Sequence, residues 1–142
     1  MSEDPTAARW APLPYDTIVY RTIRKQWAHG DELLAAAFIL DHPNRREAGL
    51  SVNETYEGAL QALNNIAGVA SLETHEIRTG CFAGHPDVHL DVERSEDDSV
   101  PGHCEIRGIP LVWQNPILQD AAQVVADYLV SISSFPAPPP SQ

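Results

Sequence analysis

Apolar and polar residues alternate along two segments in the second half of the chain, residues 87–93 and 102–107. The apolar positions are Val88, Leu90 and Val92 in the first segment and Cys104 and Ile106 in the second. Because successive side chains of a strand point to opposite faces, this pattern predicts two strands, each with one apolar face. The acidic loop SEDDSVPG lies between them. The two segments therefore predict a β-hairpin.

Charge favours one register for this hairpin. If the apolar side chains share a face, the numbers of paired residues must sum to an even value. A sum of 196 would place Asp91 opposite Glu105, a destabilising pair of like charges, whereas a sum of 194 gives complementary pairs throughout. The predicted pairs are Asp87 with Arg107, His89 with Glu105, and Asp91 with His103. In this register the segment HCEIRG is an ordinary polar strand and needs no catalytic role.

Two shorter segments with helical periodicity precede the hairpin. A helix is predicted over residues 53–66, with Ser51 or Asn53 accepting hydrogen bonds from its first free amides. Its apolar stripe comprises Tyr56, Leu60, Leu63 and Ala67. A second helix is predicted over residues 72–79, and Gly80 can supply the left-handed residue that ends it.

A longer helix is predicted over residues 115–132, with Asn115 as cap and Pro116 at its first position. Its buried stripe comprises Leu118, Ala122, Val125, Leu129 and Ile132. Residues 16–23 and 49–52 predict strands, because they are short runs rich in β-branched and apolar residues. Residues 31–40, DELLAAAFIL, fit either a helix or a buried strand.

Together these elements predict an α+β domain with helices packed on a small, mainly antiparallel sheet. The domain is expected to span residues 15–134. Residues 1–14 and 135–142 are rich in proline and small residues, which bury too little apolar surface to offset the entropy of ordering. We expect both to be flexible tails.

The amino-acid composition limits the classes of partner that the protein could bind. The chain of 142 residues has 20 acidic and 9 basic residues, and Lys25 is its only lysine. A surface of this sign repels phosphate backbones, which argues against a broad nucleic-acid interface and favours a protein partner with a basic surface. The two cysteines, and the lack of an apolar run near the roughly 18 residues of a membrane span, indicate the cytoplasm and no membrane association.

Four short blocks, VYRTIRKQW, AAAFIL, GLSV and PGHCEIRG, occur in this order between about residues 18 and 108. They resemble a family of small bacterial proteins with the pattern LYRR(I/V), SAAF, LSVD and NPAHxxIxG. The chain departs from the pattern at Thr22, at Ala35 or Ala36, at Asn53 and in VPGH. The resemblance implies a bacterial origin and a shared fold, with no biochemical activity attached.

The same blocks are more distantly similar to ADP-ribosyltransferase-type toxins, including the RES-domain group. That similarity implies Arg21 as a ribose- or phosphate-binding residue, Ser51 or Tyr56 near the pocket, and Glu105 as the late catalytic glutamate, with NAD as cofactor. A guanidinium binds phosphate through a fork of donors, and a carboxylate stabilises the positive charge formed as the nicotinamide bond breaks.

Metal and thiol chemistry have weaker support. The candidate ligands are His85, His89, His103, Cys104 and Glu105. Two histidines four positions apart share a face on a helix, whereas His85 and His89 lie where a loop leads into a predicted strand. Cys104 would point into the core. No metal site is therefore expected, and Cys81 and Cys104 are interpreted as small core residues.

Two classes of function remain. The first, which we favour, is a non-enzymatic interaction or regulatory module in a bacterial multi-gene system, with no cofactor. The second is an NAD-dependent ADP-ribosyltransferase-like enzyme or a degenerate relative. The second requires Arg21 and Glu105 to converge on one cleft.

Overall fold

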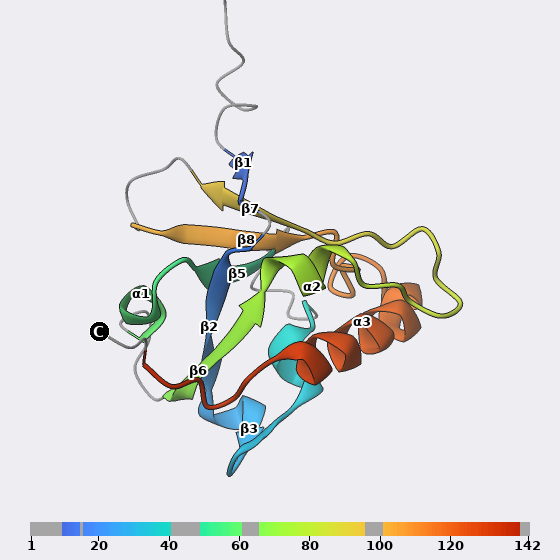
Figure 1. Ribbon diagram of the computed structural model, residues 1–142. Helices are drawn as coiled ribbons and strands as arrows, with labels where there is room; N and C mark the ends of the chain where they lie inside the picture. The colour runs from blue at the N-terminus through green and yellow to red at the C-terminus, as the bar shows by residue number, and fades with distance from the viewer. Residues whose placement is uncertain (1–9, 15, 41–48, 61–65, 96–100, 140–142) are drawn as a thin grey trace, which may run out of the picture.

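The computed structural model describes residues 10–14, 16–40, 49–60, 66–95 and 101–139 (Figure 1). A six-stranded sheet in the order β1-β7-β8-β5-β2-β6 forms its centre, and the neighbouring strands with a given register are antiparallel. The strands of this sheet are β1 (Trp10–Pro12), β2 (Ile18–Arg24), β5 (Gly49–Asn53), β6 (Ile66–Glu73), β7 (Asp91–Ser95) and β8 (His103–Arg107). A small hairpin joins β3 (Ala28–His29) to β4 (Glu32–Leu33).

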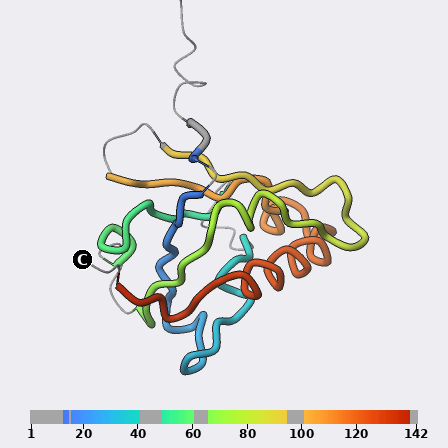
Figure 2. Tube along the Cα trace, viewed as in Figure 1, coloured from blue at the N-terminus to red at the C-terminus, as the bar shows by residue number. Residues whose placement is uncertain are grey.

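Three α-helices and three 3-10 helices complete the described chain. They are α1 (Tyr56–Leu60), α2 (Thr74–Arg78), α3 (Gln119–Ile132), η2 (Lys25–Trp27), η3 (Ala35–Phe38) and η4 (Pro116–Leu118). Figures 1 and 2 show α1 and α3 on opposite sides of β2. The predicted α+β class, with helices packed on an antiparallel sheet, is confirmed.

The two faces of the sheet differ in what covers them. We call the face that packs against α2, α3 and η3 the core face; it carries alternating apolar residues such as Val19, Leu50 and Ile106, all fully buried. The opposite face, called here the outer face, carries Tyr20, Thr22, Ser51 and Glu105, and α1 covers part of it. Alternation along each strand thus separates the buried set from the polar set.

The predicted helix over residues 115–132 is confirmed. Asn115 caps the preceding 3-10 turn by accepting a hydrogen bond from the amide of Ile117 at 3.1 Å. The buried stripe of α3 comprises Ala121, Ala122, Val125, Ala126 and Leu129. Leu118 and Ile132, predicted for this stripe, are only partly buried because they lie at or beyond the ends of α3.

Of the helix predicted over residues 53–66, the described residues show α1 (Tyr56–Leu60), whereas Asn53 ends β5 and Ile66 begins β6. Helix α1 ends at Leu60, which is 43% exposed, and Ala67 is an exposed residue of strand β6. Leu63 lies outside the described residues. Strand β6 pairs with β2 along its full length, so cross-strand pairing overrides the local helical periodicity.

The helix predicted over residues 72–79 is present as α2, but Gly80 does not end it in a left-handed conformation. A Cβ at Gly80 would lie 2.6 Å from the ring of Tyr128, so glycine is needed here for close packing. Residues 31–40 form neither a single helix nor a single strand, because β4 and η3 divide them.

The predicted hairpin is formed, but its register is wrong. Strand β7 begins at Asp91 instead of residue 87, and it pairs with β8 so that Asp91 lies opposite Arg107 and Glu93 opposite Glu105. Paired numbers sum to 198, which still keeps the apolar positions on one face. Arg107 lies close to both glutamates, at 2.9 Å from Glu105 and 3.7 Å from Glu93, and so compensates the like charges.

Both segments predicted as tails contribute to the fold at their inner ends. Leu13 is 3% exposed, and β1 pairs with β7. After α3, Ser134 forms a bridge with Ser71, and the amide of Ala137 donates to the carbonyl of Val69 at 2.7 Å. In the described part of the chain, no helix combines the length and apolarity of a membrane span.

Candidate functional site

Arg21 lies on the core face of β2 and is 7% exposed. Its Nε donates to the carbonyl of Ala37 at 2.7 Å, and its Nη1 donates to the carbonyl of Ser51 at 2.8 Å. The guanidinium also stacks on the rings of Trp27 and Phe38, at 5.1 and 5.7 Å from their centroids. These contacts join β2, β5, η2 and η3, so Arg21 holds the fold together.

Ser51 and Glu105 are directly opposite each other in the β5–β8 register and share the outer face. The carboxylate of Glu105 accepts a hydrogen bond from Arg107 at 2.9 Å. Tyr56 comes from α1, and its ring packs edge-on against Tyr20 with a centroid separation of 5.9 Å. The structure therefore places three of the four predicted transferase residues on or over one face.

The fourth residue is on the other side of the sheet. Arg21 shares the core face with Val19 and Ile23, whereas Glu105 lies on the outer face. The strands of the sheet separate the guanidinium from the carboxylate. Arg21 and Glu105 therefore do not converge on one cleft.

A small cavity of about 80 Å³ lies on the outer face between α1, β5 and β8. Ser51 and His103 line it, with Ser51 Oγ 3.4 Å from His103 Nε2, a long contact for a hydrogen bond. Thr22, another lining residue, donates its hydroxyl to the carbonyl of Ala59. Since one water takes up roughly 30 Å³ of liquid volume, this cavity suits a few waters and is too small for a dinucleotide.

Asn53 forms part of the wall of this cavity. The sequence indicated only that Asn53 could cap a helix. Its Nδ2 donates to the carbonyl of Pro101 at 3.0 Å, and its Oδ1 accepts from the amide and hydroxyl of Thr55. A Cβ at Gly58 or Gly102 would lie 2.5 or 2.6 Å from this side chain. Gly58 and Gly102 are therefore the residues in the sequence that leave room for the buried side-chain amide of Asn53. This amide links the residues before α1 to the residues before β8.

The two cysteines differ. Cys104 is fully buried, as predicted, and burial raises the pKa of its thiol to about 12. The prediction that Cys81 is a core residue is wrong, because it is exposed in the loop after α2. Cys104 therefore keeps its proton at neutral pH and cannot act as a nucleophile there.

The predicted metal candidates are dispersed. His85 and His89 lie in the loop between α2 and β7, whereas His103 and Glu105 lie on β8. Within the ranges that the structure describes, no group of three histidine, cysteine, aspartate or glutamate side chains could hold a metal ion.

The loop from Gly80 to His89 encloses a larger concavity of about 500 Å³, called here the loop hollow. Apolar side chains such as Phe82, Ala83 and Val88 line it, together with Cys81. No pattern in the sequence indicated this hollow, because it depends on how the loop folds against α3.

Three arginines of the described chain, Arg78, Arg94 and Arg107, bind carboxylates of the same molecule. Arg78 donates to Asp91 at 2.6 Å, and Arg107 contacts Glu105 as described above. Arg94 donates through Nε and Nη2 to both carboxylate oxygens of Glu54, and this hydrogen-bonded pair raises the pKa of the Arg94 guanidinium. These three guanidinium groups are therefore directed toward carboxylates of the same molecule.

Carboxylates of α2 and α3 have a different environment. The side chain of Glu76 interacts with that of Glu73, and this interaction raises the pKa of Glu76. Helix α3 carries Asp120 and Asp127 and has no lysine or arginine. Helix α3 therefore has a net negative charge.

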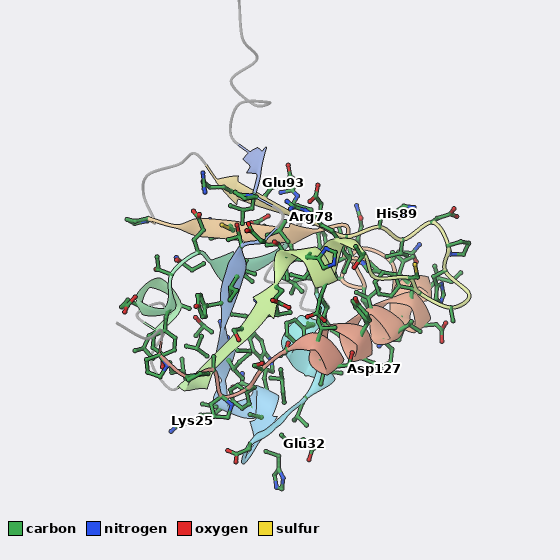
Figure 3. The ribbon with its side chains drawn as sticks, viewed as in Figure 1. Lys25, Glu32, Arg78, His89, Glu93 and Asp127 are labelled. Carbon is green, nitrogen blue, oxygen red and sulfur yellow. The ribbon has the colours of Figure 1, made fainter. Side chains whose placement is uncertain are left out.

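Arg24 and Lys25 lie next to the β3–β4 hairpin, which itself carries Asp31 and Glu32. Arg24 and Arg21 both lie over the ring of Trp27, with guanidinium-to-centroid distances of 5.4 Å and 5.1 Å. Lys25 lies in the same segment (Figure 3).

Comparison of the chain with protein-family models, with curated proteins and with solved structures found no match. The function is therefore argued from geometry and charge.

Proposed function

We propose that this protein is a non-enzymatic binding module that docks to a basic surface of a partner protein. The observation that carries the proposal is the asymmetry of its charges. Arg78, Arg94 and Arg107 bind carboxylates of the same molecule, and Arg21 binds buried carbonyl groups. With a net charge of −11, the remaining carboxylates dominate the surface.

The arrangement of the predicted catalytic residues supports a binding module over a transferase. Arg21 is buried on the core face and Glu105 lies on the outer face. The cavity beside Ser51 measures about 80 Å³, whereas ligand pockets typically measure roughly 300–1,000 Å³.

Charge complementarity governs which partner binds and how fast. Exposed ion pairs contribute only about 0–1 kcal/mol each, but a complementary field accelerates encounter and disfavours wrong partners. Such a field is screened by salt, because the Debye length falls from about 10 Å at 0.1 M to about 3 Å at 1 M. Binding to the partner should therefore weaken strongly with salt.

A selection of random peptides displayed on phage tests the proposal. We expect the enriched peptides to be rich in lysine and arginine, and the synthetic peptides to bind less tightly as sodium chloride is raised. Enrichment of neutral or acidic peptides, or binding that is insensitive to salt, would overturn the proposal.

A second measurement addresses the enzymatic alternative. Thermal unfolding with and without millimolar NAD should give the same midpoint. A ligand that binds only the native state would raise the midpoint by mass action, and a module without a nucleotide site shows no such rise. A rise in the midpoint that disappears in Glu105→Ala would instead establish a nucleotide site.

A further inference from the structure

The loop hollow is the largest concavity described above, and its lining is apolar. Its volume of about 500 Å³ falls within the roughly 300–1,000 Å³ typical of ligand pockets. Ala83 and Cys81 are exposed within it, while Phe82 forms a buried floor. An apolar side chain that enters this hollow would bury apolar area against its lining, which is favourable at about 25 cal/mol per Å² of apolar area.

Both ends of the loop are fastened to the rest of the fold. At one end, Phe82 packs edge-on against Tyr128 of α3 with a centroid separation of 5.4 Å, and Tyr128 donates to the carbonyl of Glu76 at 2.5 Å. At the other end, a Cβ at Gly108 would lie 2.0 Å from the carbonyl oxygen of His89. Between these ends, the amide of His85 donates to the carbonyl of Phe82 at 3.0 Å. These contacts hold the loop in a shape that preorganises the hollow.

Two carboxylates lie beside the hollow. Asp87 is exposed within the loop itself, between two lining residues. Asp120 of α3 is 83% exposed and lies 2.7 Å from His85, which lines the hollow. Neither the segment Gly80–His89 nor α3 contains a lysine or arginine. The apolar hollow therefore has an acidic rim.

We infer that the loop hollow is the docking site for the basic partner, and that its occupant is a peptide segment with one large apolar side chain flanked by lysine or arginine. The inference rests on the proposed function and specifies where the partner binds. The apolar side chain fills the hollow, as the central anchors of interfaces do, and the flanking cations face Asp87 and Asp120.

The probe is a short fluorescein-labelled peptide with one central tryptophan between two runs of lysine. Its control has alanine in place of tryptophan. Fluorescence anisotropy should show at least tenfold weaker binding of the alanine peptide to the wild type. Replacing Ala83 by tryptophan fills the hollow from within, so Ala83→Trp should bind the tryptophan peptide at least tenfold more weakly than the wild type does.

Matched variants separate the hollow from general effects. Ala67→Trp places the same side chain at an exposed position near the start of β6, at the opposite end of the molecule from the loop (Figure 1). The charge pair Asp87→Asn with Asp120→Asn is matched by Asp31→Asn with Glu32→Gln in the β3–β4 hairpin, which Figure 3 shows far from His89. We expect Ala83→Trp and the pair Asp87→Asn with Asp120→Asn to weaken binding. Ala67→Trp and the pair Asp31→Asn with Glu32→Gln should bind the peptide as the wild type does.

Cys81 supplies a readout that does not depend on the variants. It lines the hollow and is exposed, whereas Cys104 is fully buried. A maleimide should therefore label Cys81 alone in the folded protein, and the tryptophan peptide should slow this labelling at least fivefold. Cys81→Ser should abolish labelling.

The outcomes distinguish the two proposals. If lysine-rich peptides bind the wild type but neither Ala83→Trp nor Cys81 protection shows an effect, the docking site is wrong and the proposed function stands. If no lysine-rich peptide binds at any salt concentration, the proposed function fails and the docking site fails with it.

Discussion

Replacing Arg21 tests whether this buried cation holds the fold or binds a ligand. Arg21→Ala removes two hydrogen bonds, to the buried carbonyl of Ala37 and to the partly buried carbonyl of Ser51. Hydrogen bonds from a charged donor contribute about 1.5–3 kcal/mol each, and stacking on an aromatic ring adds about 0.5–2 kcal/mol. Because such contributions are not additive, we expect a loss of about 3–5 kcal/mol in the free energy of unfolding.

Urea and thermal unfolding followed by circular dichroism measure this loss. A domain of this size loses roughly 3 °C of melting temperature per kcal/mol, so the melting temperature should fall by on the order of 10 °C. Arg21→Lys should lie between the alanine variant and the wild type, because one ammonium cannot reproduce the fork that reaches two carbonyls.

Arg24→Ala is the matched control. Arg24 is in the same strand and stacks on the same tryptophan at 5.4 Å, but its Nε has no hydrogen-bond partner in the described structure. We expect this variant to lose less than about 1 kcal/mol. Equal losses in the two variants, or an Arg21→Ala protein as stable as the wild type, would refute the structural role.

Three further predictions concern stability. Because the buried Cys104 thiol has its pKa raised to about 12, the free energy of unfolding should fall as pH rises from the ordinary thiol pKa of about 8.5 toward 11, by up to roughly 1.4 kcal/mol per pH unit. Urea titrations at each pH should give a shallower slope for Cys104→Ala, and equal slopes would contradict the assignment. Asn53→Ala should cost about 2–3 kcal/mol in chemical denaturation, because the carbonyl of Pro101 and the amide of Thr55 lose their partner. Arg107→Ala should cost about 1 kcal/mol, and adding Glu93→Gln should recover part of it in a double-mutant cycle.

The local pattern of apolar and polar residues was sufficient to locate an element whose formation depends mainly on residues within its own segment. The cap at Asn115 and the apolar stripe of α3 lie within one continuous segment, so periodicity located this helix correctly. The hairpin of β7 and β8 was also correctly predicted, since alternation sets which side chains face the core. Its register was not, because Arg78 of α2 binds both Asp91 and the carbonyl of Val92 and so aligns the start of β7.

The positions of the candidate site residues likewise depend on contacts between distant segments. The β5–β8 register places Ser51 opposite Glu105, a neighbourhood that depends on strand pairing and is not visible in either segment alone. The position of Arg21 on the other face was not predicted, because the charge of a side chain does not reveal that it is buried against Ala37 and Trp27. The loop hollow had no signal in the sequence at all.

Composition and short-range periodicity gave the net negative charge, the α+β class and the segments of β2, β5, β8, α2 and α3, because both act within a few residues. Only the tertiary structure decided that residues 66–73 form a strand, that β7 pairs in a shifted register, and that Arg21 is separated from Glu105. These features depend on pairing and packing between segments far apart in the chain. Their free energies exceed local propensities of about 1 kcal/mol or less, so distant contacts prevail.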